Sequence, residues 1–214
     1  MSIIERKNNN QHLLLVFNGW GMDEHAFPNH PNMDMLIISE WHTHPVLPMD
    51  KIRQYEKVTL VAWSLGVWQA MNCNQLTPLK LEKAIAINGT GQPIHNEYGI
   101  PVSIFERTLQ QLNQAGRDKF QMRMMGGVRA YKSLIEQLPL RTLENQRDEL
   151  QYFWDEAQTS SSELMWTKAI IGQNDLIFPT QNQLNYWEGK AEIQTLDIPH
   201  YPFIDKIDWE TILD

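Results

Sequence analysis

The chain has 214 residues, a length that fits one folded domain with a sizeable hydrophobic core. Apolar residues make up 42% of the chain and charged residues 21%, which excludes a disordered protein. The formal net charge of −8 argues against general nucleic-acid binding, because proteins of that class neutralise phosphates with an excess of Lys and Arg.

The amino-terminal stretch MSIIERKNNNQH becomes polar and charged after four residues, so it lacks the apolar core of a secretory signal peptide. No run approaches the ~18 apolar residues that a membrane helix needs. The one cysteine, Cys73, cannot form an internal disulfide, and we expect it to be a small buried side chain. These features favour a cytoplasmic protein that binds neither membrane nor nucleic acid.

Short continuous apolar runs alternate with helical patterns along the chain. Such runs indicate strands that are buried on both faces, as in a parallel sheet covered by helices. The runs are residues 13–17, 35–39, 57–63, 83–89 and 168–175, and a last strand precedes residue 200. Helical patterns over 65–76 and 179–188 complete a strand, helix, strand order, so the predicted class is α/β.

Residues 95–160 differ in composition, being rich in Gln, Arg, Glu and Met with apolar positions at helical spacing. We expect a small helical insertion there, with QTSSSE at 158–163 leading back to the sheet. The core is then made of two parts, residues 1–94 and residues 161–214.

Ser64 lies at the predicted turn between strand 57–63 and the following helix, in the sequence Ala62-Trp63-Ser64-Leu65-Gly66. The α/β-hydrolase nucleophile occupies such a turn in the pattern G-x-S-x-G, which exposes its hydroxyl above the sheet. Alanine replaces the first glycine here and is small enough to allow the turn. The alternative is a serine at a crowded turn without any chemistry.

A serine nucleophile needs a base and a group that orients the base. Asp175 follows a predicted strand and His200 follows the last one, which gives the order nucleophile, acid, histidine expected of this fold. Asp197 and Asp205 are rival acids. The oxyanion of the tetrahedral intermediate needs two backbone donors, for which the candidates are the N–H groups of Leu65 and of Trp20 in the loop FNGWGMD.

The motifs NGWG, AWSLG, GQNDLIFP and PHYPF, in this order, resemble the BioG family of pimeloyl-acyl-carrier-protein methyl ester esterases, which are related in role to BioH-type carboxylesterases. The resemblance implies an α/β-hydrolase fold with a helical lid, and a cytoplasmic enzyme of biotin synthesis. It implies that the chain hydrolyses the methyl ester of pimeloyl-acyl carrier protein and releases methanol. By position, the triad is Ser64, Asp175 and His200, and the Trp20 and Leu65 amides form the oxyanion hole.

The predicted lid reverses the charge of the chain, because it carries six basic residues and one acidic residue between positions 107 and 132. A basic face of this kind would steer an acidic acyl carrier protein. The basic residues are Arg107, Arg117, Lys119, Arg123, Arg129 and Lys132. The alternative is a helix face that only contacts solvent. Trp20, Trp63 and Met124 are the candidates for lining an acyl-chain slot.

Two alternative functions use the same residues. An acyl-thioesterase would use the same triad on a thioester, and a non-catalytic protein would hold an acyl chain without cleaving it. His42 and His44 have the spacing of metal ligands on one face of a strand, but no nearby residue completes a site. We therefore expect neither a metal nor a cofactor.

Overall fold

A seven-stranded sheet organises the protein, in the order β1-β3-β2-β4-β5-β6-β7. The computed structural model describes residues 1–29, 31–157, 164–203 and 208–214. The strands are β1 (Ser2–Arg6), β2 (His12–Phe17), β3 (Asp34–Ser39), β4 (Lys57–Trp63), β5 (Lys83–Ile87), β6 (Lys168–Gly172) and β7 (Glu192–Leu196). The apolar runs read from the sequence form β2 to β6, and the residues of β2, β3 and β4 are almost all buried.

All neighbouring strands are parallel except β1, which pairs antiparallel with β3, with Ser2 opposite Ser39. The predicted α/β class with a mostly parallel sheet is therefore confirmed. The sequence prediction missed β1 because this edge strand is only partly buried and has no continuous apolar run. The predicted strands 83–89 and 168–175 end earlier, at Ile87 and Gly172, because the following residues turn toward the site.

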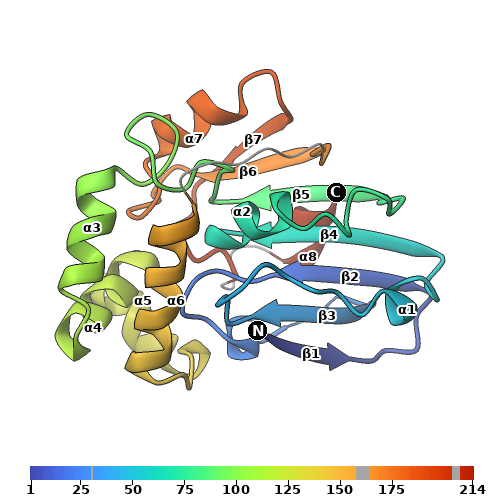
Figure 1. Ribbon diagram of the computed structural model, residues 1–214, viewed down its shortest axis with the longest axis horizontal. Helices are drawn as coiled ribbons and strands as arrows, with labels where there is room; N and C mark the ends of the chain where they lie inside the picture. Colours follow the sequence, from blue (N-terminus) through green and yellow to red (C-terminus); the bar gives the residue numbers. More distant parts are fainter. Residues whose placement is uncertain (30, 158–163, 204–207) are drawn as a thin grey trace.

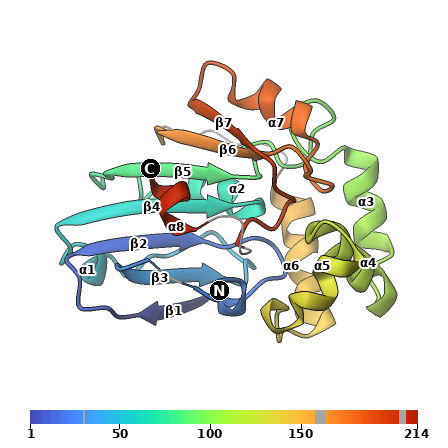
Figure 2. The same ribbon diagram turned by 180° about the vertical axis from the view of Figure 1, so that it is seen from behind.

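The helices are α1 (Met49–Ile52), α2 (Leu65–Met71), α3 (Val102–Gln110), α4 (Gln114–Met124), α5 (Val128–Ser133), α6 (Leu143–Glu156), α7 (Thr180–Trp187) and α8 (Trp209–Leu213), with short 3-10 turns at Glu24–Ala26 and Ile135–Gln137. The predicted helix 65–76 ends at Met71. The Asn72 side chain donates to the carbonyl of Trp68 (2.7 Å) at that point. Helices α1 and α2 cover one face of the sheet, and α8 covers the other (Figures 1 and 2).

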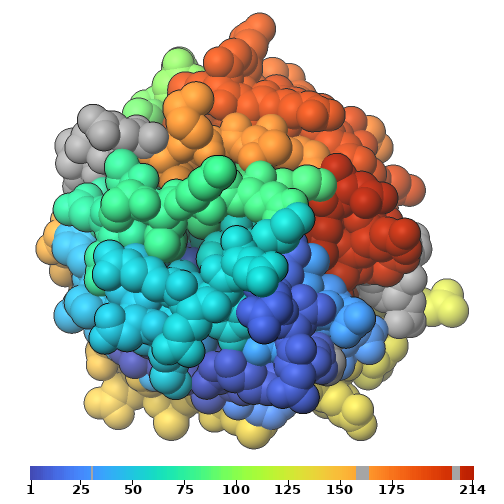
Figure 3. Space-filling model, turned by 90° about the vertical axis from the view of Figure 1, so that its right-hand side faces the viewer, coloured from blue at the N-terminus to red at the C-terminus, as the bar shows by residue number. Residues whose placement is uncertain are grey.

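Helices α3 to α6 gather at the carboxyl ends of the parallel strands (Figure 1). They lie between β5 and β6 in the chain, where the sequence predicts a helical insertion. Its exact limits stay a prediction, and the return loop at 158–163 lies outside the described residues. The opposite end of the molecule, seen in Figure 3, consists mainly of other segments, and this helical layer shows only at its margin.

The core joins both faces of the sheet to the helical layer. Large side chains that are fully buried include those of Trp41, Trp63, Trp68 and Trp187, and Cys73 is also buried, as predicted. Among the described residues, no helix has the length and apolar character to cross a membrane.

Gly66, near the start of α2, lies where the helix approaches the end of β2. A Cβ added to Gly66 would lie 2.3 Å from the backbone oxygen of Phe17. We therefore predict that Gly66→Ala lowers the free energy of unfolding by about 1–3 kcal/mol, as overpacking of a core does. Urea unfolding followed by circular dichroism measures this change.

Gly189→Ala is the matched control, because an added Cβ there meets no atom within 4 Å and only the positive φ of 72° opposes it. Gly189→Ala should lower the free energy of unfolding by only the ~1–2 kcal/mol that a left-handed backbone costs a residue with a Cβ. Equal stability of Gly66→Ala and the natural protein would show that α2 and β2 are not packed as closely as described.

Candidate active site

Ser64 lies in a strained turn between β4 and α2. Its φ of 58° and ψ of −128° fall outside the regions that side-chain-bearing residues prefer, and such strain is frequent at functional sites. The Ser64 N–H donates to the carbonyl of Ile87 at the end of β5 (2.9 Å), which fixes the turn. Gly89 lets the chain after β5 approach Ser64 closely, because a Cβ on Gly89 would lie 2.2 Å from the backbone carbonyl oxygen of Ser64. Ala62, in place of the motif's first glycine, is fully buried in β4.

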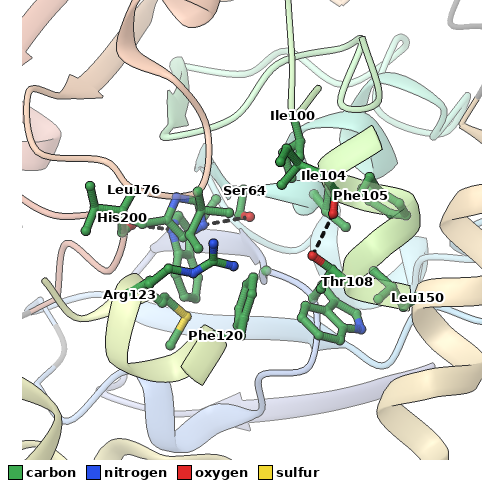
Figure 4. A pocket seen from close by; sticks show the side chains of 16 residues that line it. Ser64, Ile100, Ile104, Phe105, Thr108, Phe120, Arg123, Leu150, Leu176 and His200 are labelled. Carbon is green, nitrogen blue, oxygen red and sulfur yellow. Dashed lines mark hydrogen bonds between the residues drawn. The ribbon is translucent and has the colours of Figure 1, made fainter. Parts of the chain in front are cut away.

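His200 and Asp175 lie next to Ser64 in a hydrogen-bonded chain. His200 Nε2 is 2.9 Å from Ser64 Oγ, and His200 Nδ1 is 2.8 Å from Asp175 Oδ2. Because an ionised carboxylate only accepts hydrogen bonds, the proton of a neutral imidazole lies on Nδ1, which leaves Nε2 free to accept the serine proton. The loops after β4, β6 and β7 therefore bring together the three residues that the sequence predicts, as Figure 4 shows for Ser64 and His200.

Both oxygens of the Asp175 carboxylate accept hydrogen bonds. Its Oδ1 accepts the N–H groups of Ile177 (2.7 Å) and Phe178 (2.9 Å), and its Oδ2 accepts Gln183 Nε2 (3.0 Å) as well as His200. This environment fixes the carboxylate opposite the imidazole. The rival acid Asp197 instead accepts from Asn174, and Asp205 lies outside the described residues.

The backbone of His200 is fixed by two side chains that the sequence analysis missed or assigned otherwise. The His200 carbonyl accepts Asn88 Nδ2 (2.9 Å) and the indole N–H of Trp63 (2.9 Å). Asn88 also donates to Pro199 and accepts the Gly172 N–H (2.7 Å), and it has a positive φ of 46°. The signal in the sequence was an asparagine followed by glycine directly after strand 83–87, a position that favours both left-handed backbone and site residues.

An apolar pocket opens above Ser64 and His200, with about 530 Å³ of empty space including its mouth. Trp20, Trp63 and Met124 line it, as predicted from the sequence. The other lining side chains include Ile104, Phe105 and Thr108 of α3, Phe120 of α4 and Leu150 of α6 (Figure 4).

The two predicted oxyanion donors, Trp20 and Leu65, also border this pocket. The amides on either side of Trp20 are engaged, since Gly19 donates to Asn18 Oδ1 (2.9 Å) and Gly21 donates to Glu149 Oε2 (2.8 Å). Within the described ranges, the Trp20 and Leu65 amides have no protein acceptor. Both N–H groups are therefore available to a ligand oxygen.

Of the six predicted basic residues, three line a groove and three do not. Arg107, Lys119 and Arg123 line a groove beside the pocket, and Arg123 borders both cavities. Arg117 instead donates to the Arg141 carbonyl (3.3 Å) and to Gln114 (2.9 Å). The remaining two residues, Arg129 and Lys132, are exposed on α5 and do not line the groove.

Among the described residues, one group has the spacing of metal ligands, Asp23, Glu24 and His25. The Asp23 carboxylate already accepts His25 N–H (3.1 Å) and Leu140 N–H (2.7 Å), so it serves the local structure. His42 lies 3.2 Å from the Asn145 side chain, and the His44 ring packs near Trp68. The site described above needs none of these groups.

Comparison with known proteins places this geometry in a family. The family model described as "Pimeloyl-ACP methyl esterase BioG" matches residues 1–212. The crystal structure of BioG from Haemophilus influenzae is similar, with a TM-score of 0.90 and 30% identity over 100% of both chains. An alpha/beta hydrolase fold protein from Chitinophaga pinensis has a TM-score of 0.61 at 13% identity, covering 93% of this chain and 86% of its own, which confirms the predicted α/β-hydrolase fold.

A curated relative from Bacteroides fragilis contradicts the predicted activity. It is 41% identical over 198 residues, which are 88% of this chain and 39% of the relative, and its name is malonyl-[acyl-carrier protein] O-methyltransferase. This chain thus spans about two fifths of that relative. An O-methyltransferase forms a bond between oxygen and a methyl group, whereas the predicted carboxylesterase breaks an ester. The prediction that this chain hydrolyses pimeloyl-acyl-carrier-protein methyl ester is therefore corrected.

Asn88 provides a test of how the site is held. Asn88→Ala removes the donor to the Pro199 and His200 carbonyls and leaves the Gly172 N–H without its acceptor. Because unsatisfied buried groups cost about 1–3 kcal/mol, we predict a loss of about that size in the free energy of unfolding. We also predict slower labelling of the protein by a fluorophosphonate, measured by intact-protein mass spectrometry.

Asn185→Ala, at an exposed position of α7, is the control and should change neither value. Unchanged labelling in a less stable Asn88→Ala protein would mean that Asn88 supports the fold without positioning His200.

Proposed function

The chain belongs to the BioG family, and from this premise we propose that it is an enzyme of methyl ester metabolism linked to acyl carrier protein. In this proposal Ser64 takes up an acyl group covalently. The observation that carries it is the hydrogen-bonded chain from Ser64 through His200 to Asp175 at the floor of an apolar pocket. A role in biotin synthesis and a cytoplasmic location are part of the proposal.

The positions of the atoms support the following acylation step. His200 Nε2 takes the proton of Ser64 as Oγ forms a bond to the carbonyl carbon of the acyl chain. The carbonyl oxygen becomes an oxyanion. When the bond to the leaving group breaks, the imidazolium gives its proton to that group, and the acyl chain remains as an ester of Ser64.

The neighbouring groups stabilise the charges that this step creates. The Asp175 carboxylate holds the imidazole in the correct tautomer and stabilises the imidazolium. The free N–H groups of Trp20 and Leu65 are the donors for the oxyanion, and each such donor is typically worth ~2.7–4 kcal/mol. Two rings flank His200 and restrict it, since Phe178 stacks at 5.8 Å and Trp63 lies at 5.6 Å between ring centroids.

The pocket suits an extended acyl chain. Its lining is predominantly apolar, and Phe105, Met124 and Leu150 are buried there. Transfer of the methylene groups of an acyl chain into such a pocket contributes about 0.8 kcal/mol for each group. Trp20, Trp63 and Met124 are therefore the proposed substrate-binding residues, and a pimeloyl methyl ester is the proposed cargo.

The proposed partner is the acyl carrier protein that presents this cargo. Support comes from the names of the family and of the Bacteroides relative, which both include an acyl carrier protein. The groove lined by Arg107, Lys119 and Arg123 joins the pocket at Arg123, so a carrier docked there would have its acyl arm at the mouth. Because the chain as a whole is acidic, this local positive face also orients an acidic partner.

Acylation of Ser64 tests the proposal. We predict that p-nitrophenyl hexanoate releases a burst of about one p-nitrophenolate per protein molecule, because acylation by an activated ester precedes loss of the acyl group. Intact-protein mass spectrometry should show one hexanoyl adduct, and peptide mapping should place it on Ser64. Ser64→Ala should abolish both signals, whereas Ser103→Ala, at an exposed position of α3, should retain them. An adduct on another residue, or no adduct, would refute the proposal.

Two basic residues outside the groove provide a control for the role of the groove in binding acyl carrier protein. We predict that the double variant Arg107→Ala, Lys119→Ala weakens binding of acyl carrier protein about tenfold at low salt, with less effect at high salt because ions screen the attraction. Arg129→Ala with Lys132→Ala removes the same charge from a surface outside the groove, so it should have a smaller effect. Fluorescence anisotropy of labelled carrier protein measures both. Equal losses in the two double variants would assign the effect to overall charge.

A further inference from the structure

The most buried acidic group of the helical layer lies outside the Ser64, His200 and Asp175 chain. Glu149 of α6 is 0% exposed, and its carboxylate accepts backbone N–H groups from the loops that follow β2 and β3. Its Oε2 accepts the N–H of Gly21 (2.8 Å), and its Oε1 accepts the N–H of Trp41 (2.9 Å). Arg141 Nη1 donates to the same Oε2 (2.7 Å). In Figure 1, α6 stands at the carboxyl ends of the strands, where these loops begin.

Other groups of the helical layer hold the same few residues. Gln146 Nε2 donates to the Gly21 carbonyl (2.8 Å), and the Gln146 carbonyl accepts the indole N–H of Trp20 (2.7 Å). Arg141 donates to the carbonyl of Met22 (3.2 Å). The loop turns at Gly21 with a φ of 73°, a conformation that glycine adopts readily. Contacts from α6 and the segment before it therefore fix the orientation of the peptides on either side of Gly21.

The carboxylate of Glu149 suits the anchoring of the loop at Gly21 better than a neutral side chain would. Burial raises the pKa of Glu149, while the guanidinium of Arg141 and the two backbone N–H groups favour the charged form. A buried ion pair is a poor source of stability compared with well-packed apolar residues. An ionised carboxylate, however, accepts hydrogen bonds at both oxygens, whereas an amide accepts at one and donates at the other. Only the carboxylate satisfies Gly21 and Trp41 together.

We propose that Glu149 is a positioning residue for the oxyanion hole. By holding the Gly21 N–H, it fixes the preceding Trp20 N–H so that this donor faces the pocket above Ser64. The inference rests on the proposed function, because an oxyanion hole has a role only if Ser64 attacks a carbonyl. It adds a link between the helical layer and the reacting atoms, through which the placement of α6 sets the geometry of the donor.

Glu149→Gln is the direct test, because it keeps the size of the side chain and turns one acceptor into a donor. We expect the rate constant for Ser64 acylation by p-nitrophenyl hexanoate to fall by ~10²–10³-fold, the usual effect of losing one oxyanion donor. The ester concentration at half-maximal rate should change less than threefold, because the apolar pocket is intact. The affinity for a trifluoromethyl ketone, which forms a tetrahedral oxyanion on serine, should fall in parallel with the acylation rate.

Asp148→Asn is the matched control, since it removes a carboxylate from the adjacent, exposed position of α6 and should leave all three values unchanged. Gln146→Ala is a second variant for the case in which Glu149→Gln does not fold, and we expect a roughly tenfold slower acylation with the same parallel loss of ketone affinity.

The outcomes separate the two proposals. A folded Glu149→Gln protein with unchanged acylation and ketone affinity would overturn the inference, as would a Gln146→Ala protein with unchanged values if the first variant does not fold. A loss of thermal stability without a parallel loss of acylation and ketone affinity would also overturn it, because that pattern marks a purely structural role. Failure of the natural protein to become acylated on Ser64 would refute the proposed function itself, and the positioning role with it.

Discussion

The structure of the site depends on one constrained turn, in which Ser64 adopts a positive φ between β4 and α2. The turn is possible because the neighbouring chain comes unusually close. Gly66 lies against the end of β2, and Gly89 lies against the Ser64 carbonyl, with no room for a Cβ at either position. The hydrogen bond from Ser64 to Ile87 ties the turn to the adjacent strand. The hydroxyl is thus presented at the carboxyl end of β4, the central strand of the sheet.

The other site groups come from loops, which require separate anchors. The backbone of His200 is anchored by Asn88 and Trp63, and the Tyr201 N–H donates to the Met124 carbonyl of the helical layer (2.9 Å). The loop carrying Trp20 is anchored by α6. The helical layer therefore has two roles in this account, since it walls the apolar pocket and fixes loops on both sides of Ser64. Replacing its buried polar contacts should affect chemistry as well as stability.

Much of this arrangement was predictable from the sequence. Ser64, Asp175 and His200 each follow a recognisable strand, and parallel strands place their carboxyl ends at one edge, so sequence order alone suggested that they meet. Asn88, Gln183 and Glu149 were not predicted. Asn88 and Glu149 bind backbone groups far away in the chain, and Gln183 binds the side chain of Asp175, so no local pattern marks these contacts. Likewise, six basic residues formed one cluster in the sequence, but only three line the groove, because helix orientation separates the others.

The reaction was harder to predict from the sequence than the fold. The same motifs that identified the family led to a hydrolytic activity that the name of the Bacteroides relative contradicts. Residue types and spacings predict a nucleophile, a base and two oxyanion donors. They do not specify the acceptor of the acyl group or the substrate that a partner delivers, since these depend on molecules outside the chain.

A crystal structure of the protein treated with a trifluoromethyl ketone carrying a six-carbon chain would test the central claim most directly. The account predicts a bond from Ser64 Oγ to the ketone carbon, with the oxyanion about 2.7–3.1 Å from the amide nitrogens of both Trp20 and Leu65. It also predicts that the alkyl chain lies in the apolar pocket between α3 and α4. A ketone bound away from Ser64, or an oxyanion directed into solvent, would contradict it.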